Sequence, residues 1–160
     1  MSGTRLAGAR VLVTGGGSGL GRRLAIGAAR RGATPVVWDL SAERAHAVRD
    51  DIRAHGLTAE AHVVDVTDRA AVREAAAATG DVDVVINNAG VVSGRPLLET
   101  PDAAIERTMA VNVLSLYWVT RAFLPAMVER RRGTVVTVAS AAGLVGVARQ
   151  TDYAASKWAA

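Results

Sequence analysis

Short runs of β-branched residues alternate with longer segments of helical character along the chain, and this alternation limits the fold more than any other feature. The runs are "ARVLVT", "TPVVWD", "AEAHVVDV", "VDVVIN" and "GTVVTVAS", at residues 9–14, 34–39, 59–66, 82–87 and 133–140. They do not alternate in polarity, which is typical of strands buried on both faces by helices. The pattern therefore predicts an open, doubly wound α/β fold with a parallel sheet of about five strands.

The segments between these runs carry helix-start signals. Helices are expected from about Gly19 to Arg31 and from Ser41, Asp68 and Pro101, and another begins within "DYAASKWAA" at 152–160. Ser41 is expected to cap its helix, and Thr100 is expected to be the N-cap before Pro101 at the first helical position. No linker, repeat or low-complexity segment interrupts the pattern, so residues 1–160 are predicted to form a single domain.

Composition narrows the class of protein. Half of the 160 residues are hydrophobic and only 4% are aromatic, so the core is expected to consist of Val, Leu, Ile and Ala. No run approaches the roughly 18 uncharged apolar residues of a membrane helix, and no secretory signal precedes the first glycine cluster. We therefore expect a cytoplasmic protein without a membrane span. The absence of cysteine excludes disulfides and thiol nucleophiles.

A formal charge of +4 and a pI near 10.6 raise the possibility of nucleic-acid binding. The arginines, however, are spread through the helical segments, and the dense run 130–132 precedes Gly133, where a helix C-terminus favours cations. No nucleic-acid partner is expected. His46, His55 and His62 share no metal-ligand spacing, so no metal site is expected either.

Five glycines occur within seven residues of "VLVTGGGSGLGRRLA", between the first predicted strand and the first predicted helix. Backbone amides and the positive end of a helix dipole at such a junction can hold a phosphate. The pattern is T-G-x-x-x-G-x-G with Gly15, Gly19 and Gly21. A P-loop is the alternative, but Arg22 and Arg23 stand where Lys and Ser/Thr are needed. A plain glycine turn would explain one or two glycines better than five.

Asp39 ends the second predicted strand, 18 residues after Gly21. In a dinucleotide fold a carboxylate at this place accepts hydrogen bonds from the adenosine ribose and repels a 2′-phosphate. NAD is therefore favoured over NADP, because Ser18 brings no compensating charge to the loop, although Arg22 or Arg23 could swing round. The alternative role for Asp39, capping the next helix, suits Ser41 better.

Further motifs follow in order: "DV" at Asp65 and Val66, "NNAG" at 87–90, Asn112, Ser140 and "YAASK" at 153–157. Together with the glycine loop they make the chain resemble the short-chain dehydrogenase/reductase family over essentially its whole length. The resemblance implies an NAD(P)-dependent alcohol dehydrogenase or carbonyl reductase, with homodimers or homotetramers among full-length relatives. Three segments, "NNAGVVSGRPLLETPD", "AFLPAMVER" and "ASAAGLVG", are most similar to the retinol dehydrogenase and 17β-hydroxysteroid dehydrogenase branch, which suggests an apolar alcohol or carbonyl substrate.

The same resemblance assigns roles to the matching positions. It implies that Gly15, Ser18, Gly19, Leu20 and Gly21 cradle a pyrophosphate, that Asp65 and Val66 flank the adenine, and that Asn88, Ala89 and Gly90 support the sheet and the cofactor. Asn112 would bind a water that links Lys157 to solvent. The segment "LVGVARQ" at 144–150 is expected to pass over the substrate.

Tyr153 and Lys157 are four residues apart in a predicted helix, so their side chains share one face. A free tyrosine, with a pKa of about 10, is a poor base near neutrality, but a nearby ammonium favours the phenolate. Tyr153 is the expected general acid/base, Lys157 also holds the nicotinamide ribose, and Ser140 donates to the substrate oxygen. Tyr117 has no lysine four residues on and is expected in the core.

Family members usually run to about 250 residues, so the resemblance predicts an incomplete enzyme that lacks the sixth and seventh strands. The fifth strand would then be an exposed apolar edge, and we expect the polypeptide to be poorly soluble or weakly active. A cofactor-binding fragment without turnover is the alternative function.

Overall fold

Five parallel strands form one sheet within residues 5–160, the part of the chain that the computed structural model describes. They are β1 (Arg10–Thr14), β2 (Thr34–Asp39), β3 (Glu60–Val63), β4 (Val84–Asn87) and β5 (Thr134–Thr137). The spatial order is β3-β2-β1-β4-β5, so the direction of winding reverses between β1 and β4. The predicted doubly wound parallel sheet is therefore confirmed. A crevice forms at the carboxyl ends of the strands where such a sheet changes direction.

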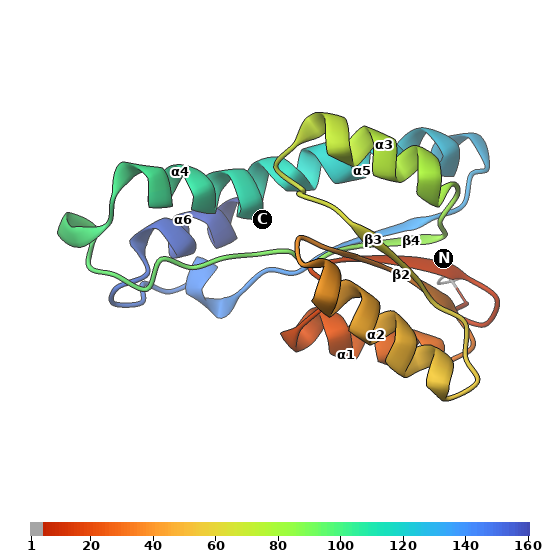
Figure 1. The fold of residues 1–160 in the computed structure, drawn as a ribbon. Helices are drawn as coiled ribbons and strands as arrows, with labels where there is room; N and C mark the ends of the chain where they lie inside the picture. Colours follow the sequence, from red (N-terminus) through yellow and green to blue (C-terminus); the bar gives the residue numbers. More distant parts are fainter. Residues whose placement is uncertain (1–4) are drawn as a thin grey trace.

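Helices cover both faces of the sheet (Figure 1). Their bounds are α1 Gly19–Ala29, α2 Ala42–Ala54, α3 Arg69–Thr79, α4 Asp102–Met109, α5 Ser115–Glu129 and α6 Thr151–Ala159, with a π-helical segment η2 (Ala110–Leu114) joining α4 to α5 and 3-10 turns η1 (Leu97–Glu99) and η3 (Ala141–Gly143). One apolar cluster lies under α1 and α2, and a second lies under α3 and α5. In Figure 1, α4 and α6 extend together beyond the end of the sheet.

The helix starts agree with the sequence pattern except at one place. Ser41 caps α2 by accepting a hydrogen bond from the Arg44 amide at 3.3 Å, and Asp68 caps α3. Thr100 was expected to cap the next helix, but that prediction is wrong. Its hydroxyl donates instead to the Pro96 carbonyl at 2.9 Å, and Pro101 is the N-cap of α4. Thr100 ends the turn η1, because its backbone amide donates a hydrogen bond to the Leu97 carbonyl.

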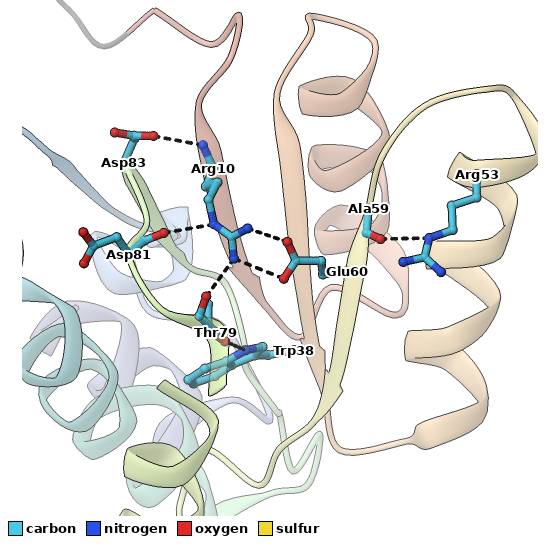
Figure 2. Close-up of polar contacts among 8 residues, drawn as sticks. All are labelled: Arg10, Trp38, Arg53, Ala59, Glu60, Thr79, Asp81 and Asp83. Atoms are coloured by element: carbon cyan, nitrogen blue, oxygen red, sulfur yellow. Dashed lines mark hydrogen bonds and ion pairs between the residues drawn. The ribbon is translucent and has the colours of Figure 1, made fainter. Parts of the chain in front are cut away.

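The amino ends of the strands are joined by Arg10, at the start of β1 (Figure 2). Its guanidinium donates to both carboxylate oxygens of Glu60 in β3 and to the carbonyl of Thr79 at the end of α3. The Thr79 hydroxyl in turn accepts from the buried Trp38 ring at 3.1 Å. Arg10 is thus a structural crosslink at the end of the sheet opposite the crevice.

Tyr117 was expected in the core, and this prediction is wrong, because its side chain is 59% exposed. The core-facing residues of α5 are Val119, Phe123 and Met127, spaced by four. Residues two apart do not face the same side of a helix, so Tyr117 lies away from the sheet.

The continuous helix from α4 to α5, Asp102–Glu129, is long and apolar enough, with a mean hydropathy of 1.3 over its best window, to pass a test for membrane crossing by length and composition. One such helix is weak evidence for a membrane span, because core helices of soluble proteins can be equally long and apolar. Val119, Phe123 and Met127 of this helix pack in the second core cluster.

Candidate active site

Two adjoining cavities open at the carboxyl ends of the strands. The first, the glycine-loop cavity, has a volume of about 360 Å³. It is lined by Gly15, Ser18, Gly19, Leu20, Gly21, Asp39, Leu40, Arg44, Val64, Asp65, Val66, Asn88, Ala89, Gly90, Val91, Arg107 and Val111. The second, the tyrosine cavity, has a volume of about 500 Å³ and is lined by Leu20, Asn88, Gly90, Val91, Val92, Val138, Ala139, Ser140, Gln150, Tyr153 and Lys157. Four residues line both cavities, so an elongated ligand can extend from one to the other.

The glycine loop packs so closely against itself and against the segment after β4 that a side chain at Gly21 is excluded. A Cβ on Gly21 would lie 2.2 Å from the Gly15 carbonyl oxygen, and Gly15 itself has a φ of +61°. Ser18 is the N-cap of α1 but makes no side-chain capping bond, and the first turn of α1 contains no acidic residue. The amides at this helix start therefore face the cavity without a neutralising side chain, which suits a phosphate group.

Thr14 and Asn88 hold the loop in place. The Thr14 hydroxyl accepts hydrogen bonds from the amides of Asn88 and Ala89, at 3.0 and 3.1 Å. The Asn88 side-chain nitrogen donates to the carbonyls of Thr14 and Gly15, at 2.9 and 3.3 Å. The "NNAG" segment is thus a brace for the glycine loop. Thr14 was not singled out from the sequence, although its position immediately before Gly15 was a signal.

Asp39 is buried at the end of β2 and accepts three hydrogen bonds. One carboxylate oxygen accepts from the Gly17 amide at 3.0 Å, and the other accepts from the Ser41 amide at 3.0 Å and the Arg44 guanidinium at 3.2 Å. Arg22, suggested above as a compensating charge, pairs instead with Asp51 at 2.8 Å.

Asp65 and Val66 form another part of the same wall. Val66 is buried, whereas Asp65 is exposed and accepts from both the amide and the hydroxyl of Thr67, at 2.9 and 2.7 Å. Arg107, an exposed residue of α4, also lines this cavity and was not predicted. The cavity therefore combines apolar walls with two carboxylates and two guanidinium groups.

Tyr153 and Lys157, both in α6, line the tyrosine cavity together. The Lys157 ammonium is buried and donates to the Val138 carbonyl at 2.7 Å, and it lies 5.8 Å from the centre of the Tyr153 ring. Burial lowers the pKa of Lys157 because it disfavours the charged form. Tyr153 and Lys157 therefore lie on one face of α6, as expected. One of the three N–H donors of Lys157 is already bonded to the Val138 carbonyl.

Ser140 follows β5 and lines the tyrosine cavity together with Tyr153 and Lys157 of α6. Its hydroxyl oxygen accepts from the Ala142 amide at 3.2 Å and so caps η3. That bond uses the oxygen as an acceptor and leaves the hydroxyl proton as a donor for a ligand.

Asn112 does not line either cavity. It is 1% exposed within η2, and its side chain exchanges two hydrogen bonds with the backbone of Val91 and donates to the Ser156 hydroxyl at 2.9 Å. A Cβ on Gly90 would lie 3.4 Å from the Asn112 side-chain oxygen and 3.7 Å from the Lys157 nitrogen. Asn112 is therefore a strut between the loop after β4 and α6, and its expected link to Lys157 through water stays a prediction. Asn112 lies in the π-helical segment η2, and π-helical turns often occur at functional sites.

Asp152, next to Tyr153, is a buried carboxylate that sequence reasoning missed. It accepts from the Ser93 hydroxyl and the Thr108 hydroxyl, each at 2.7 Å. Burial acts to raise the pKa of Asp152, but the hydrogen bonds from Thr108, Ser93 and backbone amides outweigh it and hold the pKa below its usual value. An acidic residue in the first turn of a helix was the available signal, but the partners are distant in sequence.

No group of three or more His, Cys, Asp or Glu side chains that could hold a metal ion occurs in the part of the chain that the structure describes.

Comparison with protein families gives a match over residues 9–160 to the family described as short chain dehydrogenase. Curated relatives include short-chain dehydrogenase/reductase family 16C member 6 of Bos taurus, 44% identical over 94% of this chain and 49% of the relative. Retinol dehydrogenase 10-B of Danio rerio is 41% identical over 93% and 52%, and 17-beta-hydroxysteroid dehydrogenase 13 of Homo sapiens is 40% identical over 97% and 53%. The chain thus spans about half the length of these relatives.

Solved structures agree in fold. A metagenomic short-chain oxidoreductase in complex with NADP superposes with a TM-score of 0.89 at 37% identity, covering 98% of this chain and 73% of that one. NAD⁺-bound xylitol dehydrogenase superposes with a TM-score of 0.91 at 28% identity, covering 98% and 62%.

Proposed function

Because the chain belongs to the short-chain dehydrogenase/reductase family, we propose that it contributes the cofactor site and the proton-transfer residues of an NAD(P)-dependent oxidoreductase that interconverts an alcohol and its ketone or aldehyde. One observation carries the proposal. Ser140, Tyr153 and Lys157, from two separate segments, line one cavity that adjoins the glycine-loop cavity.

The residues present fit a dinucleotide. The glycine loop and the start of α1 would hold the pyrophosphate, and Gly21 keeps the loop in this shape because a Cβ there would lie 2.2 Å from the Gly15 carbonyl oxygen. Asp39 would accept from the adenosine ribose, and Asp65 with Val66 would flank the adenine. Lys157, with two of its three donors left after Val138, would hold the nicotinamide ribose. When bound, the cofactor would accept or supply the hydride.

Tyr153 would move the proton. In the oxidative direction its phenolate oxygen takes the hydroxyl proton of the alcohol, and in the reductive direction its hydroxyl gives that proton to the carbonyl oxygen. Ser140 donates a hydrogen bond to the same substrate oxygen and so fixes it beside Tyr153. Lys157 favours the phenolate by its charge.

We propose an apolar substrate. Leu20, Val91, Val92 and Val138 contribute apolar groups to the tyrosine cavity. Leu144 and Val145, in the segment expected to cover the substrate, are 78% and 62% exposed. The names of the retinol and 17-beta-hydroxysteroid dehydrogenases among the relatives also support this choice.

We also propose NAD as the preferred cofactor. The support is the buried Asp39 carboxylate, which stands where a 2′-phosphate would be repelled. Solved neighbours hold either NADP or NAD⁺, so they do not choose between the two.

Turnover of a secondary apolar alcohol with NAD, followed as NADH formation, tests the proposal. Tyr153→Phe is expected to lower kcat by a factor on the order of 10² to 10⁴, because it removes the proton-transfer group. Tyr117→Phe is the matched control, since Tyr117 is exposed outside both cavities, and it should retain full turnover. Equal turnover in both variants would contradict the assignment of Tyr153.

Binding of the cofactor without turnover is the second candidate, favoured by the span of only about half of each curated relative. Fluorescence titration with NADH, run beside the turnover assay, separates the two. NADH binding with no turnover for any alcohol or carbonyl compound would support the second candidate.

A further inference from the structure

The first turn of α6 contains a buried carboxylate that the proposed proton transfer does not use. Asp152 is 6% exposed and lines neither of the two cavities. Its two oxygens accept from hydroxyls of different elements, one from Ser93 in the loop after β4 and one from Thr108 in α4, each at 2.7 Å. A buried charge is tolerated only where partners of this kind compensate it. Asp152 therefore joins three segments of the chain at one point.

Two hydrogen bonds, one helical turn apart, join α6 to the continuous helix of α4 and η2. Thr108 donates to Asp152, and Asn112 donates to Ser156 at 2.9 Å. Thr108 and Asn112 are four residues apart, and so are Asp152 and Ser156, so each pair lies along one helix face. All four side chains are at most 6% exposed, and α4 and α6 extend together beyond the end of the sheet (Figure 1). The two bonds therefore fix both the position and the rotation of α6.

The rotation of α6 matters because Tyr153 and Lys157 immediately follow its two anchored residues. Successive residues of a helix point about 100° apart. A rotation that broke the bonds of the buried face would therefore also turn Tyr153 away from the tyrosine cavity. The N-cap of this nine-residue helix, Gln150, makes no side-chain capping bond, so contacts with other elements must set the position of the helix.

The loop after β4 is fixed on both sides of Val92, which lines the tyrosine cavity. On one side, Asn112 exchanges two hydrogen bonds with the backbone of Val91, at 2.8 and 2.9 Å. On the other side, the Ser93 hydroxyl donates to Asp152. This wall of the cavity is thus bonded directly to α6, and Asp152 makes the bond.

We propose that Asp152 is a positioning residue for the reaction, with a separate task for each of its oxygens. The bond from Thr108 sets the place of Tyr153, and the bond from Ser93 sets the place of the wall at Val92. The inference rests on the proposed alcohol oxidation, but it concerns residues that touch neither substrate nor cofactor. The two bonds should therefore affect different kinetic constants, since the wall binds the substrate and Tyr153 moves the proton.

Steady-state oxidation of 2-octanol with saturating NAD, on the full 160-residue chain, tests the two bonds separately. Ser93→Ala is expected to raise KM for the alcohol roughly fivefold and to change kcat less than about twofold. Thr108→Val keeps the shape of the side chain and is expected to lower kcat about tenfold or more, because a small displacement of a reacting group is costly, with KM changed less than about twofold. Ser93→Thr and Thr108→Ser keep the hydroxyl and should restore the wild-type constants.

A double substitution assigns the effect of Ser93 to Asp152. In an Asp152→Asn background, Ser93→Ala is expected to raise KM by less than about a further twofold, because both substitutions act on the same bond. Additive effects of the two substitutions on KM would contradict the inference.

Thr100→Val is the matched control. Thr100 is a buried residue of the same loop, and its hydroxyl donates to the Pro96 carbonyl rather than to α6. The substitution removes a buried hydrogen bond of the same kind, so it should lower stability in urea denaturation while both kinetic constants stay at their wild-type values.

A spectroscopic measurement tests the geometry without turnover. The chain contains two tyrosines, Tyr117 and Tyr153, so a chain labelled with 3-fluorotyrosine should give one fluorine resonance for each, and Tyr117→Phe assigns them. Thr108→Val should shift the resonance of Tyr153 and leave that of Tyr117 in place. Thr100→Val should shift neither.

The outcomes separate this inference from the proposed function. Wild-type constants in Ser93→Ala and Thr108→Val, or equal losses in Thr100→Val, would overturn the inference and leave the dehydrogenase proposal standing. Parallel changes of KM and kcat in both variants, or a Tyr153 resonance that Thr108→Val does not shift, would also overturn it. A shifted Tyr153 resonance in a chain without turnover would support the positioning of Tyr153 while contradicting the dehydrogenase proposal.

Discussion

The neighbours of Gly21 exclude a side chain at that position, whereas those of Gly90 leave room for a Cβ. At Gly21 a Cβ would meet the Gly15 carbonyl and the Asn88 side chain, at 2.2 and 2.5 Å. At Gly90 the missing Cβ leaves the Asn112 oxygen and the Lys157 nitrogen facing a shared space. Gly21 therefore tolerates no added atom, whereas a Cβ at Gly90 would make only ordinary van der Waals contacts.

Gly21→Ala is predicted to destabilise the fold by about 1 to 3 kcal/mol, the usual cost of forcing atoms into a packed site, and to abolish binding of NADH. Chemical denaturation and fluorescence titration measure the two effects. Gly27→Ala in the same helix is the matched control, since its Cβ would meet only the end of the Arg31 side chain at 3.5 Å. It should stabilise α1 by about 0.5 to 1 kcal/mol. Unchanged binding by Gly21→Ala would contradict the cradle.

At the scale of elements, the position of α6 decides whether Tyr153 and Lys157 reach the site. A helix of nine residues has little stability alone. Hydrogen bonds hold α6 in place. Asp152 bonds it to α4 and to the loop after β4, and Ser156 bonds it to Asn112. Gly143 packs against it so closely that a Cβ would lie 2.6 Å from the Lys157 carbonyl.

Asp152→Ala is predicted to lower the free energy of unfolding by about 3 kcal/mol, because two hydroxyl donors lose a buried charged acceptor. Urea denaturation measures it. Asp102→Ala, at the exposed first turn of α4, removes a similar helix-dipole contact and should cost about 0.3 to 1 kcal/mol. Similar losses in the two variants would contradict a docking role for Asp152.

The same carboxylate predicts a pH dependence. Since the pKa of Asp152 is lowered in the folded chain, its stabilisation is fully present above the unfolded value of about 3.9 and is lost as pH falls through the folded pKa. The stability difference between wild type and Asp152→Asn should therefore be constant near neutrality and shrink below about pH 4. Denaturation at stepped pH checks it, and a difference that grows on acidification would contradict it.

At the scale of the whole molecule, the two ends of the sheet have different tasks. Arg10 crosslinks the amino ends (Figure 2), while the cavities open at the carboxyl ends. One side of the sheet ends at β5, where Val135 and Val136 are 39% and 41% exposed. The expected exposed apolar edge is thus present, and unpaired edges of this kind promote association.

Val136→Lys is predicted to reduce aggregation of the chain, because a charged residue on an edge strand opposes edge-to-edge pairing. Light scattering against time at a fixed concentration measures it. Leu98→Lys, at a fully exposed residue of η1 away from the sheet, adds the same charge and controls for net charge. Equal aggregation of the two variants would show that the β5 edge does not cause the association.

The sequence pattern predicted the elements well where they depend on local order. All five observed strands lie inside predicted runs, and Ser41 and Asp68 start their helices as expected. The N-cap was misplaced by one residue, at Thr100 instead of Pro101, because the 3-10 turn before it was not recognised. Tyr117 was misplaced because a missing catalytic partner says nothing about which side of a helix faces the sheet.

The sequence by itself determined the parallel α/β architecture, the glycine loop and the shared face of Tyr153 and Lys157, because these depend on periodicity and on spacing within a few residues. Only the tertiary structure decided that Arg44 pairs with Asp39, that Asp152 meets Ser93 and Thr108, and that Asn112 braces α6. Those contacts join separate elements, mostly segments tens of residues apart, and such pairings follow from packing rather than from local sequence.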